Sequence, residues 1–215
     1  MEKWLDNVTY GNPVDKLLPF MRAGVYDFLL PELKQYPFPS NSCEMTQDEL
    51  RMLIELQNSE EQKNTTITSR YLDYDKDIVT IFKSFCKKRL NQDYDEEIDE
   101  LIQDLAVLIT KLKFAYQRPR PFQIAQYYKA RLFPVLSLVA ISPSYPSGHT
   151  IEAKVMAELI GSRHPDQYEF LSRLADDIAQ SRLFLGLHFP SDNDFGLMVA
   201  KAVYTSKQFT TKYGL

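Results

Sequence analysis

Three polar clusters in the second half of the chain carry residue types that bind an oxyanion and exchange protons. In chain order they are Lys113 with Arg120-Pro121, then Pro146-Ser147-Gly148-His149, then Ser181-Arg182 with His188 and Asp192. Lysine and arginine neutralise the charge of phosphate-type oxygens. Histidine exchanges a proton near neutral pH. The residue types therefore predict one anion pocket that contains two imidazoles.

Helical spacing indicates that Lys113 points inward. It ends a line of apolar residues at steps of three or four, formed by Ile102, Ala106 and Ile109. A charge on an inward face is costly unless it is paired. The alternative is a surface lysine whose stem covers apolar neighbours while its ammonium group reaches water. The spacing of this one residue leaves both interpretations open.

The other polar residues also interrupt apolar helical faces. Arg182 lies near the end of one such face, and His149 begins another. Arg182 could form a structural ion pair with Asp177 or Glu169. His149 or His188 could be an ordinary core histidine with satisfied hydrogen bonds. Their occurrence together, at regular spacing, favours a functional site.

Hydrophobic periodicity predicts an all-α fold. A clear 3.6-residue stripe indicates a long helix from about Glu96 to Tyr116. Further helices are expected from Gly148 to Arg163, from Pro165 to about Leu187, and after Ser191 or Asp192. Thr46 to Glu49 has the pattern of a capping box that starts an earlier helix, and Asn64 to Thr68 resembles a polar loop. Because no convincing alternating strand is present, we predict a packed, single-domain helical bundle.

The first 45 residues are expected to differ from the rest. They contain five of the twelve prolines, which break regular structure, yet they are too apolar to be disordered. We predict that residues 1–45 form an extension with a short helix or two, and that residues 46–215 form the all-α domain. The extension could rim the pocket or form a homo-oligomer contact, although simple packing on the body is the plainer interpretation.

Composition limits the partners and the location. The net charge of −4 and the absence of a basic tract predict no nucleic-acid partner. The two cysteines, Cys43 and Cys86, predict reduced thiols, and no Cys/His spacing predicts a metal site. The longest apolar run is shorter than the roughly 20 residues that a membrane span needs. With no secretory signal evident, we expect a cytoplasmic protein without a membrane span.

The three clusters together resemble the signature of the type 2 phosphatidic acid phosphatase and vanadium haloperoxidase superfamily. That signature is Lys-x6-Arg-Pro, then Pro-Ser-Gly-His, then Ser-Arg-x5-His-x3-Asp, and every fixed position is present between residues 113 and 192. Lys111 with Arg118-Pro119 also fits the first part. The inward direction of Lys113 favours Lys113 with Arg120, which leaves Arg118 as a rim residue. Without a membrane span, the chain is most similar to the soluble class A acid phosphatases.

The resemblance implies a reaction through a phosphohistidine. His188 would be the nucleophile, and Asp192 would accept a hydrogen bond from its other ring nitrogen. His149 would protonate the leaving alkoxide and later activate water. The implied fold is the all-α fold of the acid phosphatases and vanadium haloperoxidases.

The resemblance also implies how the phosphate group is held. Lys113, Arg120 and Arg182 would neutralise the phosphoryl oxygens without a metal or cofactor. Ser147 would supply a hydroxyl group, and Gly148 would offer its amide at a helix N-terminus. Vanadate is expected to bind there as an inhibitor.

The expected function is therefore that of an acid phosphatase-like phosphoric monoester hydrolase. Its partner would be a small-molecule phosphate ester or a pyrophosphate-type compound. The first alternative is a vanadium-dependent haloperoxidase, for which vanadate would be the cofactor. The second is a non-catalytic phosphate-binding or scaffold protein.

Overall fold

A computed structural model describes residues 3–59, 65–135 and 137–215, and in these residues every regular element is a helix. The main helices are α2 (Glu44–Gln57), α4 (Thr65–Lys76), α5 (Ile78–Phe85), α6 (Asp95–Tyr116), α7 (Pro121–Ala125), α8 (Gly148–Arg163), α9 (Tyr168–Phe184), α10 (Pro190–Tyr204) and α11 (Lys207–Tyr213). The all-α prediction is confirmed. Among these helices none is long and apolar enough to cross a lipid bilayer.

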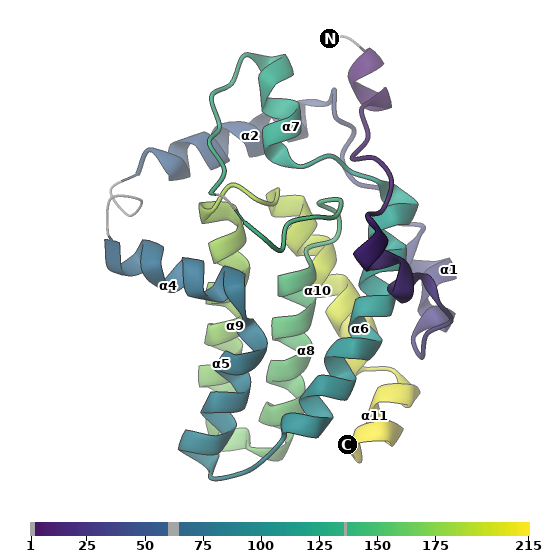
Figure 1. The fold of residues 1–215 in the computed structure, drawn as a ribbon, viewed down its shortest axis with the longest axis vertical. Coiled ribbons are helices and arrows are strands. Elements are labelled where there is room, and N and C mark those ends of the chain that lie inside the picture. Colours follow the sequence, from purple (N-terminus) through teal and green to yellow (C-terminus); the bar gives the residue numbers. More distant parts are fainter. Residues whose placement is uncertain (1–2, 60–64, 136) are drawn as a thin grey trace.

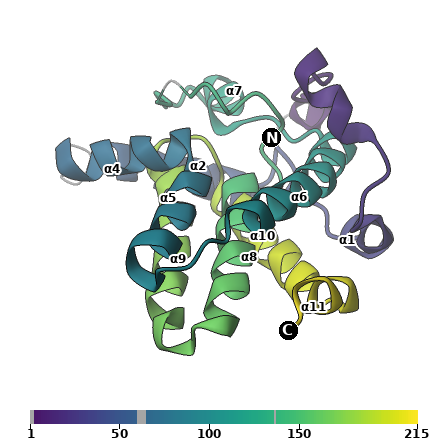
Figure 2. The same ribbon diagram turned by 60° about the horizontal axis from the view of Figure 1, so that its bottom comes forward.

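Helix α8 is the centre of the bundle. It packs against α9, α10, α6 and α5, as Figures 1 and 2 show from two directions. Its sequence explains this position, because apolar side chains surround it instead of forming a single stripe. Seven of these side chains are buried, namely Ile151, Ala153, Val155, Met156, Ala157, Leu159 and Ile160.

The long helix α6 lies beside α8 and has clear start and stop signals. Three acidic residues, Asp95, Glu96 and Glu97, occupy its first turn, where their negative charges interact favourably with the positive end of the helix dipole. The helix ends at Tyr116, and the left-handed backbone conformation of the next residue, Gln117 (φ 53°), turns the chain before Pro119. The predicted helix from Glu96 to Tyr116 is therefore confirmed to within one residue.

The N-terminal segment consists of short helical turns that are joined by irregular chain. They are η1 (Lys3–Asn7), η2 (Asp15–Met21), η3 (Asp27–Leu29) and α1 (Leu30–Leu33). Figure 1 shows this segment along the side of α6, which both η2 and α1 contact. An ion pair of 2.6 Å between Lys111 of α6 and Asp27 of η3 fastens it there.

Several predicted helix boundaries were wrong. Helix α2 begins at Glu44, because the Thr46 hydroxyl donates to the carbonyl oxygen of Ser40 (2.8 Å) and does not cap the helix. The expected polar loop after Asn64 is helical from Thr65, and Asn64 itself lies outside the described residues. Pro190 is the first residue of α10, a position where its missing N–H costs nothing. The C-terminal helix α11 was not predicted.

Candidate active site

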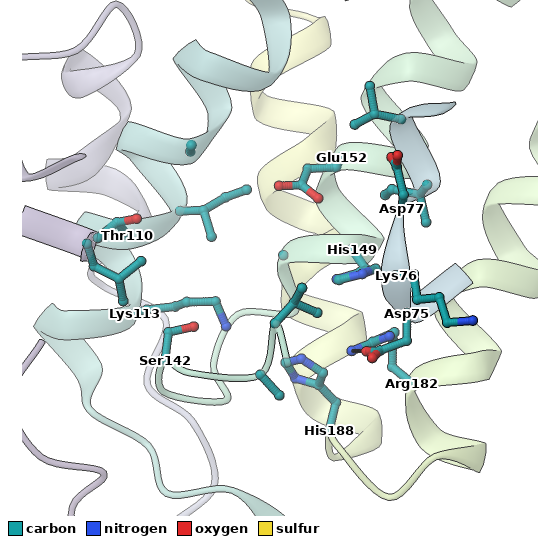
Figure 3. Close-up of a pocket in the computed structure, with 18 of the residues that line it drawn as sticks. Asp75, Lys76, Asp77, Thr110, Lys113, Ser142, His149, Glu152, Arg182 and His188 are labelled. Atoms are coloured by element: carbon teal, nitrogen blue, oxygen red, sulfur yellow. Dashed lines mark hydrogen bonds and ion pairs between the residues drawn. The ribbon is translucent and has the colours of Figure 1, made fainter. Parts of the chain in front are cut away.

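One pocket of about 310 Å³ collects most of the predicted site residues (Figure 3). Lys113 comes from the last turn of α6, His149 from the first turn of α8, and Arg182 from the last turn of α9. Arg120, Gly148 and His188 line the same pocket. The two imidazoles and the three cations therefore share one cavity, as the sequence predicts.

His188 is reached through a tight turn after α9. Gly186 there has φ +69°, a left-handed conformation that favours glycine. Nδ1 of His188 lies 3.2 Å from Oδ2 of Asp192, which also accepts a hydrogen bond of 2.9 Å from the amide of Phe189. A carboxylate can only accept, so Nδ1 carries the proton and the lone pair of Nε2 is free of it. This is the tautomer that a nucleophilic Nε2 requires.

Arg120 contacts the other side of the same imidazole. Its NH1 group lies 2.9 Å from Nε2 of His188 and donates a second bond of 2.9 Å to the carbonyl oxygen of Leu187. Burial, assisted by Arg120, holds the pKa of His188 well below its usual value. The imidazole is therefore neutral, and its lone pair faces a cation at the pocket wall.

Lys113 is almost fully buried, which confirms the inward direction read from its helical line. Its ammonium group donates to the carbonyl oxygens of Pro143 (2.6 Å) and Ser144 (3.4 Å). Burial, and then the positive charge of Arg120, hold the pKa of Lys113 well below its usual value. An anion that entered the pocket would relieve this unfavourable concentration of positive charge.

Arg182 is paired with a residue that the sequence analysis did not identify. Its NH2 group lies 2.8 Å from Oδ1 of Asp75, at the end of α4. Neither of the two partners considered for Arg182 pairs with it. Asp177 accepts bonds of 3.0 Å from the hydroxyl groups of Tyr71 and Tyr74, and Glu169 pairs with Arg173. Nε and NH1 of Arg182 are buried without a hydrogen-bond partner among the described residues. These N–H groups are available to an oxyanion.

His149 is the second imidazole that lines the pocket. It lies in the first turn of α8, directly after Gly148. Burial lowers its pKa well below the usual value, and the nearby charge of Arg182 acts in the same direction. A hydrogen bond with the backbone of Asp75 opposes that shift. The ring is therefore neutral until an anion offsets the charge of Arg182.

Gly148 and Ser147 lie at the N-terminus of α8, where no side chain caps the helix. A Cβ atom on Gly148 would lie 3.8 Å from Cε of Lys113. The absence of a side chain at Gly148 therefore leaves space in the pocket beside the ammonium group. Ser147 is fully buried beneath the lining, and its hydroxyl oxygen accepts a bond of 2.9 Å from Thr150. A direct contact of Ser147 with phosphate stays a prediction.

Arg118 is not the rim residue that we expected. Its guanidinium is fully buried, stacks over the ring of Phe189 at 4.0 Å, and pairs with Asp192 at 2.6 Å and Glu49 at 3.1 Å. Burial alone would raise the pKa of Asp192, but Arg118 and His188 together hold it well below its usual value. Local spacing missed this role because both partners of Arg118 lie far away in the sequence.

The pocket includes further residues that were not predicted. Glu152 lines it one helical turn after His149, and Asp75 lines it from α4. The spacing of three residues after His149 was a usable signal for Glu152. Leu17 and Phe20 of η2 line the pocket too, so the N-terminal segment forms part of its rim.

Comparisons with known proteins agree with this fold. Residues 102–208 match the family model described as the PAP2 superfamily. Over 136 residues, the chain is 27% identical to a non-specific acid phosphatase of Salmonella typhi and 26% identical to one of Salmonella typhimurium. Each alignment covers 61% of this chain and 54% of the relative, so the chain matches about half the length of these curated proteins.

Two solved structures share the fold. A bacterial vanadium-dependent iodoperoxidase superposes with a TM-score of 0.57 at 17% identity, covering 79% of this chain and 52% of that one. A transmembrane PAP2-type phosphatidylglycerolphosphate phosphatase from Bacillus subtilis superposes with a TM-score of 0.54 at 16% identity, covering 94% and 96%.

The helices packed around α8 have a PAP2-type, haloperoxidase-like fold. Their pocket contains two histidines and three cations. The family match over residues 102–208 includes all three polar clusters, from Lys113 to Asp192. The chain belongs to the PAP2 superfamily, with distant homology to the class A acid phosphatases. The resemblance read from the sequence is confirmed.

Proposed function

We propose that this protein is a metal-independent phosphatase that hydrolyses phosphate monoesters, or pyrophosphate-type substrates, through a phosphohistidine on His188. The observation that carries the proposal is the orientation of His188. Asp192 holds the protonated Nδ1, and the unprotonated Nε2 faces a pocket lined by cations. The homology to acid phosphatases supports the same reaction class.

In the first step Nε2 of His188 attacks phosphorus and the bond to the ester oxygen breaks. The electron pair of that bond leaves with the oxygen, which takes a proton from His149. A bound phosphate dianion offsets the charge of Arg182, which favours the protonated form of His149 that this step needs. Asp192 stabilises the positive charge that develops on His188.

In the second step water releases the phosphate. His149, neutral after the first step, accepts a proton from water as its oxygen attacks phosphorus. The bond between phosphorus and Nε2 breaks, and the electron pair returns to the imidazole of His188. The products are inorganic phosphate and the free enzyme with its original protons.

Three cations replace the metal ion that many phosphoryl-transfer enzymes use. Lys113, Arg120 and Arg182 all line the pocket, and Arg182 has two buried nitrogens, Nε and NH1, without a partner among the described residues. Charge spreads over the equatorial oxygens during phosphoryl transfer, so preorganised cations lower the barrier. Arg120 would move its NH1 bond from Nε2 of His188 to a phosphoryl oxygen, which exposes the nucleophile.

The test is hydrolysis of 4-nitrophenyl phosphate by the purified protein. We expect turnover that EDTA does not reduce, no turnover by His188→Ala, and a severe loss in His149→Ala. Intact mass after a rapid quench should show one phosphoryl group on the wild type and none on His188→Ala. Activity that survives His188→Ala would overturn the proposal.

A vanadium-dependent haloperoxidase is the second candidate, supported by the fold shared with the iodoperoxidase and by a pocket shaped for a tetrahedral oxyanion. Halide oxidation by peroxide with added vanadate, in the absence of ester hydrolysis, would favour it. Loss of both activities in a folded protein would favour the phosphate-binding scaffold.

A further inference from the structure

Glu152 places a carboxyl group in the pocket that the proposed reaction does not use. Figure 3 shows it one turn beyond His149 on α8, with its carboxylate directed into the space between α8 and α6. Within the described part of the chain, no ion pair or hydrogen bond holds this carboxylate. It is attracted by Lys113 and Arg182 at longer range only.

The residues that would hold the phosphate are deeply buried, so the leaving group extends away from them into the outer part of the pocket, which includes Glu152. Arg120, Arg182 and His188 are each at most 2% exposed. The outer part contains Glu152 on one wall and Thr110 of α6 on the other. Apolar side chains such as Phe20 complete it. Lys76 and Asp77, where α4 meets α5, also line the pocket, but Lys76 pairs with Asp73 and Asp77 accepts bonds from Thr80. The outer part therefore mixes polar and apolar groups, and among the described residues Glu152 is the carboxylate there without such a partner.

The position of Glu152 matches a definite part of the leaving group. His149 would protonate the ester oxygen, and Glu152 follows it three residues later on the same face of α8, a rise of about 4.5 Å between the two backbone positions. A substituent on the second carbon of the alcohol is three bonds from the ester oxygen, so it comes within reach of a carboxylate one helical turn away. Glu152 is thus placed beside that substituent.

The electrostatic state of Glu152 favours a ligand group that donates a hydrogen bond. Burial raises its pKa to about 7, although Lys113 and Arg182 pull in the opposite direction. A hydroxyl or ammonium group would supply the partner that the carboxyl lacks. An apolar group would leave it desolvated and unpaired, which binding sites penalise strongly.

We propose that Glu152 is a specificity-determining residue that selects phosphate esters of alcohols with a hydroxyl or ammonium group on the second carbon. The inference rests on the proposed phosphatase function of the same pocket. It narrows the substrate class to small hydroxylated or aminated alcohol phosphates, such as those of polyols, sugars and amino alcohols.

Three related substrates that differ only at the second carbon test the proposal, namely ethyl phosphate, 2-hydroxyethyl phosphate and 2-aminoethyl phosphate. We compare kcat/KM between the wild type and Glu152→Leu for each substrate separately, so that leaving-group reactivity cancels. We expect a fall of about tenfold for the hydroxyl and ammonium esters, the size of one lost hydrogen bond to a charged group, and a change below about twofold for ethyl phosphate. Equal falls for all three esters, or no fall, would overturn the proposal.

Glu152→Gln separates the two kinds of donor. Its amide oxygen still accepts a bond from a hydroxyl group but offers no charge to an ammonium group. The loss should therefore be larger for 2-aminoethyl phosphate than for 2-hydroxyethyl phosphate. Glu158→Gln, on the same helix but outside the pocket, is the matched control and should leave all three values unchanged.

A binding measurement keeps this inference separate from the proposed function. Calorimetry with His188→Ala and with His188→Ala/Glu152→Leu gives the affinity of each intact ester. Weaker binding of the two donor-bearing esters in the double variant supports the role of Glu152 even if the wild type hydrolyses nothing. Unchanged relative affinities would sink it, even if the wild type proves to be an active phosphatase.

Discussion

The guanidinium of Arg118 lies 2.6 Å from Oδ1 of Asp192, while His188 uses the other oxygen of the same carboxylate, Oδ2, at 3.2 Å. Asp192 is therefore held from both sides in a fully buried position. Glu49, which also accepts a bond of 2.6 Å from the amide of Ser191, anchors Arg118 in turn. A line of alternating charges thus runs from α2 to the imidazole of His188.

Arg118→Lys should slow catalysis although Arg118 does not line the pocket. A lysine keeps one charge but loses the forked contact to Asp192 and Glu49, so the imidazole is held less firmly. Loss of about 2 kcal/mol of transition-state stabilisation corresponds to a fall in kcat of about thirtyfold, with KM little changed. Steady-state kinetics on 4-nitrophenyl phosphate measure both constants.

The pH profile of Arg118→Lys distinguishes positioning from general damage. Arg118 is the main influence that holds the pKa of Asp192 low, so a weaker contact lets that pKa rise. The low-pH limb of the kcat/KM profile should then move to higher pH. A reduced rate with an unmoved limb would contradict this role. Arg173→Lys, in an exposed ion pair with Glu169, is the control.

Sequence periodicity located the site well because its main elements are local. The bounds predicted for helix α8, Gly148 to Arg163, are the observed ones. The Pro-Ser-Gly run marks where the irregular chain stops, and the apolar pattern that follows is continuous. The inward direction of Lys113 followed from α6 alone. Such features depend on residues within a few turns of one another.

The partners of the buried charges could not be predicted in the same way. Arg182 pairs with Asp75, 107 residues earlier, and Arg118 pairs with Glu49, 69 residues earlier. Helical spacing gives the face on which a residue lies but not the element that packs against that face. The pairing of α4 with α9, and of α2 with the segment between α6 and α7, arises only from tertiary packing.

Asp75→Asn should weaken the ligand-free protein and increase its response to phosphate. The substitution removes the counter-charge of a buried arginine, which costs about 3 kcal/mol of folding free energy. A bound anion would replace that charge at Nε and NH1 of Arg182. Inorganic phosphate should therefore raise the Tm of Asp75→Asn more than that of the wild type. Equal shifts in thermal denaturation would show that Asp75 and the anion do not share Arg182.

Glu152→Gln should stabilise the protein above neutral pH but not in acid. The folded-state pKa of about 7 exceeds the ordinary value of 4.5, so folding favours the protonated carboxyl. The wild type therefore loses stability as the pH rises from about 4.5 through 7, by on the order of 2 kcal/mol, and glutamine avoids this loss. Denaturant unfolding at pH 4 and pH 8 measures the difference. A constant difference at both pH values would contradict the raised pKa.

Vanadate should bind the pocket and stabilise the fold through the same cations as phosphate. A ligand at 100 times its Kd that binds only the folded state adds about 2.7 kcal/mol of stability, which thermal denaturation detects readily. Arg182→Met should remove most of this shift, because it deletes Nε and NH1, the two buried nitrogens that have no partner among the described residues. Arg173→Met, on the exposed side of the same helix, should keep it. If Arg182→Met responds to vanadate as strongly as the wild type, the oxyanion binds elsewhere and the arrangement of His149, His188 and the three cations does not form the phosphate site.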